Sequence, residues 1–172
     1  MIRIARLAML AAMALGCVTA QGVKLGIVNS QKAMLDTSEI KKAQLDLETK
    51  YKPRQDQLAQ LQKDLSLLQA QIQSGKLTPA AQQDVTAQGQ RKEREYQRVS
   101  EDLQADVDRD RNDILARTSQ RMRDVVGKLA NEKGLDVVVD SANTVFYKAA
   151  LDLTGEATAA YDKAYPVSGA SK

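Results

Sequence analysis

Histidine is absent from the 172-residue sequence, and cysteine occurs only once, as Cys17. Without histidine the chain cannot form a Ser–His or Cys–His nucleophilic pair, and it has no imidazole for a metal site or a proton shuttle. A single cysteine forms neither an intramolecular disulfide nor a cysteine-rich zinc site. Aromatic residues are only 3% of the chain and tryptophan is missing, which argues against base stacking on single-stranded nucleic acid. We therefore expect a protein that is not an enzyme and that acts through shape, apolar surface and charge.

The first twenty residues have the layout of a secretory signal peptide. Arg3 and Arg6 precede the apolar run LAMLAAMAL, and small residues precede a predicted cleavage between Ala20 and Gln21. The apolar run is too short to cross a hydrocarbon core about 30 Å thick. The alternative is a lipid anchor, because the sequence ALGC ending at Cys17 loosely resembles a bacterial lipoprotein box.

Positive and negative charges almost balance in the rest of the chain. Removal of residues 1–20 leaves 23 basic and 22 acidic residues, a net charge of +1. Such a weak overall field argues against nucleic acid as a partner. No glycine loop of the type that holds phosphate is present, and the acidic residues between 101 and 113 recur at helical spacing rather than in a calcium loop. We expect no cofactor and no metal site.

Two long stretches with helical periodicity are separated by a turn. Residues 38–74 carry a heptad seam at 3-4 spacing, and extended backwards the same frame also collects Gln44 and Arg54. The turn is SGKLTP, with Pro79 suited to the first helical position and Gly134 suited to the end of the returning helix. The seam residues are Ile40, Leu47, Tyr51, Leu58, Leu61, Leu65, Leu68 and Ile72. The returning helix is longer, so its last turns are predicted to lie beside the sheet described next.

The two ends of the mature chain predict a small sheet. Residues 23–29 alternate as a strand, residues 135–140 (LDVVVD) form a β-branched run, and residues 145–148 (VFYK) are predicted as a further strand. Ser30 is predicted to cap a short helix, and a closing helix is expected from Asp152 or Thr154 to Tyr165. Three short strands are marginal alone, so we expect copies of the chain to associate.

The fold class is therefore α+β and predominantly α, with a small β body and a long, protruding antiparallel helical hairpin. The predicted regions are the signal (1–20), the first part of the body (21–37), the hairpin arm (38–133), the second part of the body (134–166) and a polar tail (167–172). Within the arm, Pro53 removes a backbone donor and is predicted to kink or interrupt the first helix. Gly89 is a second hinge candidate, in a segment poor in large apolar residues.

The order of these segments resembles the OmpH/Skp family of periplasmic chaperones. The resemblance is carried by GIVNSQK from residue 26, YKPRQ from residue 51, LDVVVD from residue 135 and DLT from residue 152. It implies a jellyfish-like homotrimer in the periplasm, with three arms around a cavity that holds unfolded outer-membrane proteins without ATP. The chain departs from the strongly basic members of that family in its balanced charge. A rival interpretation is a structural coiled-coil spacer in the envelope that binds no client.

Two groups of arm residues are candidates for binding. The first consists of apolar residues that stray from the main seam and are predicted to contact clients: Leu45, Leu67, Leu77, Val85 and Val99. The second follows from residues 50–98, where nine basic and five acidic residues give +4. Its members are predicted to form a basic tip: Lys76, Arg91, Lys92, Arg94 and Arg98. This tip either attracts an acidic membrane surface or is simply a solvated helix face.

Overall fold

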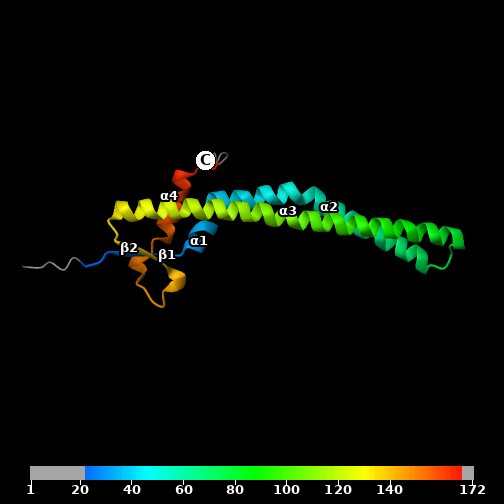
Figure 1. Cartoon of the computed structure of the whole chain (residues 1–172), viewed down its shortest axis with the longest axis horizontal. Coiled ribbons are helices and arrows are strands. Elements are labelled where there is room, and N and C mark those ends of the chain that lie inside the picture. The colour runs from blue at the N-terminus through cyan, green and yellow to red at the C-terminus, as the bar shows by residue number, and fades with distance from the viewer. Residues whose placement is uncertain (1–21, 168–172) are drawn as a thin grey trace, which may run out of the picture.

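The computed structural model describes residues 22–167, which form a small body with one long arm (Figure 1). We use "body" for residues 22–37 and 134–167 together with the end of the arm that packs on them, and "arm" for residues 38–133. The predicted signal, its cleavage between Ala20 and Gln21, the lipidation of Cys17 and residues 168–172 of the tail lie outside the described residues.

The sheet of the body joins the two ends of the described chain. Strand β1 (Leu25–Val28) pairs in parallel with β2 (Val137–Asp140), in a register that places Leu25 opposite Val137 and Val28 opposite Asp140. Parallel strands need a crossover connection, and here the connection is the arm with the short helix before it. The prediction that both ends of the chain build one sheet is confirmed.

The predicted third strand at residues 145–148 is wrong. This segment lies between the short 3-10 helices η1 (Ser141–Asn143) and η2 (Ala149–Leu151) and has no strand partner. β1 offers this segment no edge, because it is flanked by β2 on one side and by a bridge from Ile27 to Asp152 on the other, and the segment does not pair with the outer edge of β2. The Val145 and Phe146 side chains remain in solvent, with exposed fractions of 107% and 81%.

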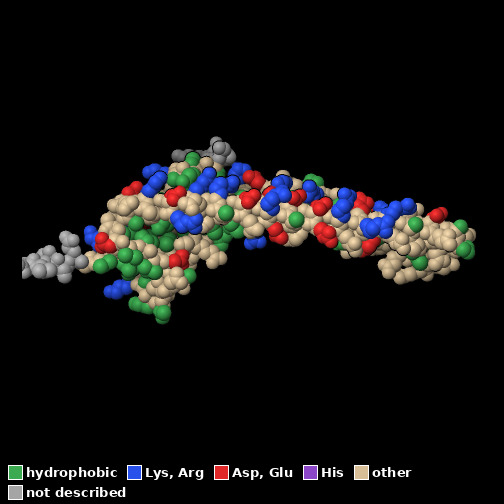
Figure 2. Space-filling view, viewed as in Figure 1, with side chains coloured by type: hydrophobic (Ala, Val, Ile, Leu, Met, Phe, Trp, Pro, Cys, Tyr) green, Lys and Arg blue, Asp and Glu red, His purple; other side chains and the backbone are tan. Residues whose placement is uncertain are grey.

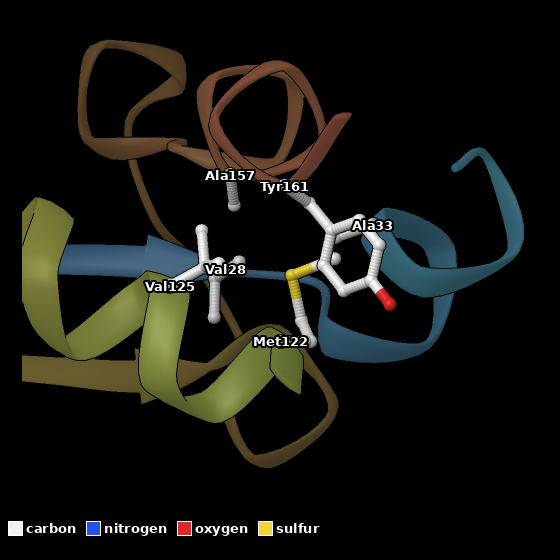
Figure 3. Packing of buried hydrophobic residues seen from close by; sticks show 6 residues of the cluster. All are labelled: Val28, Ala33, Met122, Val125, Ala157 and Tyr161. Carbon is white, nitrogen blue, oxygen red and sulfur yellow. The ribbon is translucent and has the colours of Figure 1, made fainter. Parts of the chain in front are cut away.

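Two short helices complete the body and form its core with the arm. Helix α1 (Ser30–Leu35) is capped by Asn29 rather than by the predicted Ser30, because the Asn29 side chain accepts a hydrogen bond from the Lys32 amide at 2.8 Å. Helix α4 (Thr154–Ala164) starts at the second of the two predicted positions. Figure 3 shows the core side chains: Val28, Ala33, Met122, Val125, Ala157 and Tyr161.

The arm is an antiparallel hairpin of α2 (Ser38–Gln73) and α3 (Pro79–Lys133). Thr78 caps α3 with its hydroxyl, and Gly134 ends α3 in the left-handed conformation at φ 62°, as its position in the sequence predicts. The last turns of α3 lie beside the sheet and contribute Met122 and Val125 to the core, which confirms the expectation from the unequal helix lengths.

Pro53 does not interrupt α2. The helix is continuous from Ser38 to Gln73, and Figure 1 shows it crossing behind α3 along the arm. A proline inside a helix costs one backbone hydrogen bond, and here packing offsets that cost because Tyr51 and Leu61 on either side of Pro53 are buried against α3. The seam residues predicted from the heptad are all buried or half-buried.

Candidate functional site

The five predicted client-contact residues differ in exposure. Leu45 and Leu67 lie on the outer surface of α2, with exposed fractions of 64% and 55%. Leu77, Val85 and Val99 are half-buried along the distal half of the arm. The arm of a single copy therefore presents two isolated leucines on a largely polar surface, rather than one continuous apolar stripe.

The five residues of the predicted basic tip also differ, because in the part of the chain that the structure describes one of them is paired with a carboxylate and four are not. Lys92 forms an ion pair with Asp64 across the hairpin, with Nζ 2.7 Å from Oδ2. The other four cations are exposed, and among residues 22–167 they have no carboxylate within ion-pair distance: Lys76, Arg91, Arg94 and Arg98. The three arginines follow each other at three- and four-residue spacing, which places them on one side of α3. Figure 2 shows blue side chains on the distal part of the arm.

A set of ion pairs between α2 and α3 fixes the register of the arm. Asp110 accepts hydrogen bonds from Lys50 and, at 2.7 Å, from the Tyr51 hydroxyl, while Asp106 accepts from Arg54 at 2.5 Å. The hydrogen bond from Lys50 is the main cause that lowers the pKa of Asp110, and the bond from Arg54 is the main cause that lowers the pKa of Asp106. The sequence pattern predicted only that these carboxylates lie on a helix and not in a calcium loop. Their four-residue spacing, which matches that of Lys50 and Arg54, is the signal that could have predicted the pairing.

A second cluster joins the root of the arm to the body. Glu39, near the start of α2, accepts hydrogen bonds from Arg121 at 2.9 and 3.0 Å, from Arg117 at 3.1 Å and from the Tyr161 hydroxyl. We call these four residues the root cluster. Tyr165 lies beside them, with its ring 4.6 Å from the Arg121 guanidinium. The cluster therefore ties α2, α3 and α4 together where the arm leaves the body.

The root cluster holds a partly buried charge. Burial works to raise the pKa of Glu39, but the hydrogen bonds from Tyr161 and Arg121 and the Arg121 charge outweigh burial, so the pKa lies below its usual value. Burial, followed by the bond to Glu39, raises the pKa of the Tyr161 hydroxyl. The cluster was not predicted from the sequence, because its members are separated by up to 122 residues and no local pattern links them.

The body carries an apolar surface next to the sheet. A groove of about 660 Å³ lies between the sheet and the segment from Thr144 to Leu151, lined mainly by apolar side chains that include Leu25, Ile27 and Phe146. Val137 of β2 is also exposed, at 45%. Figure 2 shows hydrophobic side chains gathered on the body, including the end formed by the segment between β2 and α4. A single copy leaves this surface in water.

Two kinds of site are absent from the part of the chain that the structure describes. Residues 22–167 contain no group of three or more cysteine, aspartate or glutamate side chains placed to hold a metal ion. None of the helices within the same residues combines the length and the apolar character that a membrane span requires.

These features define an α+β protein with a hairpin arm, whose candidate contacts lie on open surfaces along the arm and on one face of the body. Residues 24–161 match the family described as outer membrane protein (OmpH-like), and the chain belongs to this family. The family consists of chaperones rather than enzymes, and membership supports a role as a periplasmic chaperone.

Two known proteins resemble the chain over most of its length. A Skp-like protein from Pseudomonas aeruginosa is 25% identical over 134 residues, which cover 77% of this chain and 80% of that protein. The crystal structure of an OmpH-like outer membrane chaperone from Caulobacter crescentus has a TM-score of 0.70 at 19% identity, covering 83% of this chain and 85% of that one. The structural likeness confirms the predicted fold of a small sheet with long helices.

Proposed function

We propose that this protein is an ATP-independent holdase of the periplasm, which shields unfolded outer-membrane or envelope proteins between the arms of a homotrimer. The observation that carries the proposal is the solvent-exposed apolar surface of the body, which includes the exposed side chains of Val137, Val145 and Phe146 and the 660 Å³ groove that Phe146 lines. Family membership supports the compartment and the class of client.

The apolar face of the body supports association of copies. A two-stranded sheet is too small to be stable without a larger apolar contact, and a large exposed patch of this kind marks an interaction surface. Residues 145–148 retain the β-branched and aromatic composition of a strand but belong to no strand in one copy. In the proposed trimer these segments lie against neighbouring copies, and the arms project from the shared body around a central space. The division into body (21–37 and 134–166) and arm (38–133) belongs to this proposal.

Clients are proposed to bind through many weak apolar contacts along the arm. Leu45 and Leu67 offer exposed apolar surface in one copy, and Leu77, Val85 and Val99 add the accessible parts of half-buried side chains. Each Å² of apolar area that a client buries contributes about 25 cal/mol. Such contacts tolerate many client sequences, as a holdase requires.

An aggregation assay tests the function. The protein is mixed with a β-barrel membrane protein diluted out of urea, and light scattering is followed. We expect the wild type to suppress scattering at one trimer per client, and we expect a double variant, L45S with L67S, to suppress it less. A matched double variant at exposed polar positions of α2, Q55S with Q57S, should behave as the wild type. Full scattering in the presence of stoichiometric wild type would favour the rival, an envelope spacer.

The exposed arginines at the distal part of the arm favour one additional contact, with an acidic membrane surface. Arg91, Arg94 and Arg98 lie on one side of α3 and have no carboxylate partner within residues 22–167. Three arms would present this cationic surface three times. Flotation with vesicles tests the contact: we expect binding to vesicles rich in phosphatidylglycerol at low salt, and none to pure phosphatidylcholine. Equal binding to both vesicles would contradict it.

A further inference from the structure

An apolar groove of about 360 Å³ lies at the root of the arm, where α1 ends beside α2 and α3 passes both. Its apolar lining comes from three helices. Leu35, the last residue of α1, borders it and is 42% exposed. Leu47 of α2 and Ile114 and Leu115 of α3 contribute half-buried side chains. The groove is separate from the apolar face of the body and from the two exposed leucines of α2.

A polar residue that lines the groove occupies a seam position. The spacing from Ile40 to Leu47 calls for an apolar side chain at residue 44, which is glutamine. The other polar residue in this frame, Arg54, is accounted for by its bond to Asp106. The Gln44 side chain is exposed and donates no hydrogen bond to any residue between 22 and 167, so packing in one copy does not explain it.

Arg111 is the one charged residue among those that line the groove in the described chain. It lies one turn before Ile114 and Leu115, on the same side of α3. Its neighbours Arg109 and Asp110 are engaged in ion pairs, whereas the exposed Arg111 guanidinium has no carboxylate within ion-pair distance in residues 22–167. An apolar surface is thus bordered by two sets of free donors, a guanidinium and a side-chain amide.

We propose that this groove binds the C-terminal residue of an unfolded client, with its apolar side chain on Leu47, Ile114 and Leu115 and its terminal carboxylate on Arg111. The inference rests on the proposed holdase function. A guanidinium matches a carboxylate with two parallel hydrogen bonds. Only a chain end carries a backbone carboxylate and an apolar side chain on the same residue. The volume lies at the lower end of the range of about 300–1,000 Å³ for ligand pockets, which suits one or two residues rather than a long segment.

Fluorescence anisotropy with two dye-labelled peptides tests the proposal. The peptides share one uncharged sequence ending in phenylalanine, and one carries a free C-terminal carboxylate while the other is amidated. We expect the free acid to bind the wild-type protein about tenfold or more tightly than the amide. In the variant R111Q the two peptides should bind with the same affinity. The control R123Q removes the same charge from an exposed arginine of α3 outside the groove and should keep the preference.

A second variant separates binding from folding. Q44L places an apolar side chain at the seam position that glutamine occupies, so it should raise the melting temperature while it weakens binding of the free-acid peptide. Binding unchanged in Q44L, or a preference for the free acid that persists in R111Q, overturns the proposal. A wild type that suppresses client aggregation yet binds acid and amide equally overturns this inference alone, whereas a wild type that suppresses no aggregation overturns the holdase function. Displacement of the peptide by octanoate at a lower concentration than by unlabelled peptide would assign the groove to a lipid instead.

Discussion

The root cluster makes Glu39 the most informative single position for the stability of the arm. Its carboxylate is 13% exposed and accepts hydrogen bonds from Arg117, Arg121 and Tyr161, so it contacts two other helices at once. The variant E39Q keeps the size and one acceptor oxygen of this side chain but removes its charge. Arg121 then loses its ionic partner beside the buried Tyr161 ring.

The loss of stability in E39Q follows from the hydrogen bonds whose acceptor is no longer ionised. A bond to an ionised group contributes about 1.5–3 kcal/mol to stability, against about 0.5–1.5 kcal/mol for a neutral bond. Since the side-chain amide in E39Q would still accept one or two neutral bonds, we expect this variant to lower the free energy of unfolding at pH 7 by about 1–2 kcal/mol. The exposed Glu48 on the same helix forms no ion pair within residues 22–167. The control E48Q should therefore change the free energy of unfolding by less than about 0.5 kcal/mol.

The same bonds make the effect depend on pH. The pKa of Glu39 is lower in the folded protein than its usual value of 4.5, so its ionised form stabilises the fold at every pH above that value. This stabilisation is lost as pH falls through the lowered folded-state pKa. The difference between wild type and E39Q should therefore be constant near neutrality and shrink steadily in acid.

Urea unfolding followed by circular dichroism measures both effects, in a series from pH 7 to pH 3. Protein concentration must be held fixed, because association of copies makes the apparent stability depend on it. A difference between wild type and E39Q that is the same at pH 7 and in acid would refute the assigned charge interaction. If E39Q lowers the free energy of unfolding no more than E48Q does, the root cluster does not stabilise the fold as argued.

Three further predictions concern the body and the arm. The variant F146D places a charge on the exposed apolar face of the body and should shift the protein towards single copies in sedimentation velocity, with unchanged helix content by circular dichroism; unaltered sedimentation would contradict the assembly surface. Hydrogen exchange should be faster in residues 75–95, where large apolar pairs are few, than at Val137–Val139, and equal protection would contradict the prediction of a hinge at Gly89. The variant P53A restores a backbone donor in α2, so it should raise the melting temperature and slow exchange around residue 53, and faster exchange there would contradict the assigned cost of one missing backbone hydrogen bond at Pro53.

The long-range shape of this protein could be predicted from its sequence because periodic patterns determine it. The heptad from Ile40 to Ile72, the turn before Pro79 and the end at Gly134 predicted both long helices, because helix periodicity and terminal residues are local signals. Of the two effects predicted at Pro53, a kink or an interruption, the interruption is wrong, and the kink stays a prediction. Interhelical packing around Tyr51 keeps α2 continuous, and a rule about one residue does not include that packing.

Contacts between distant segments could not be predicted from the sequence in the same way. The strand expected at residues 145–148 has the right composition but pairs with neither strand of the sheet in one copy, and strand formation depends on such a partner. The root cluster joins side chains from three helices, and only the folded chain brings them together. For the candidate site, the sequence predicted exposed leucines at positions 45 and 67. It did not predict that Lys92 pairs with Asp64 while its neighbouring arginines remain free.

The molar mass of the processed protein in dilute native solution tests the central claim most directly. Light scattering coupled to size-exclusion chromatography gives this mass independently of the elongated shape. The account predicts three times the mass of one mature chain, because the apolar face around Phe146 needs neighbouring copies to cover it. A stable species with the mass of one chain would contradict the shared body, and with it the cavity in which clients are proposed to be held.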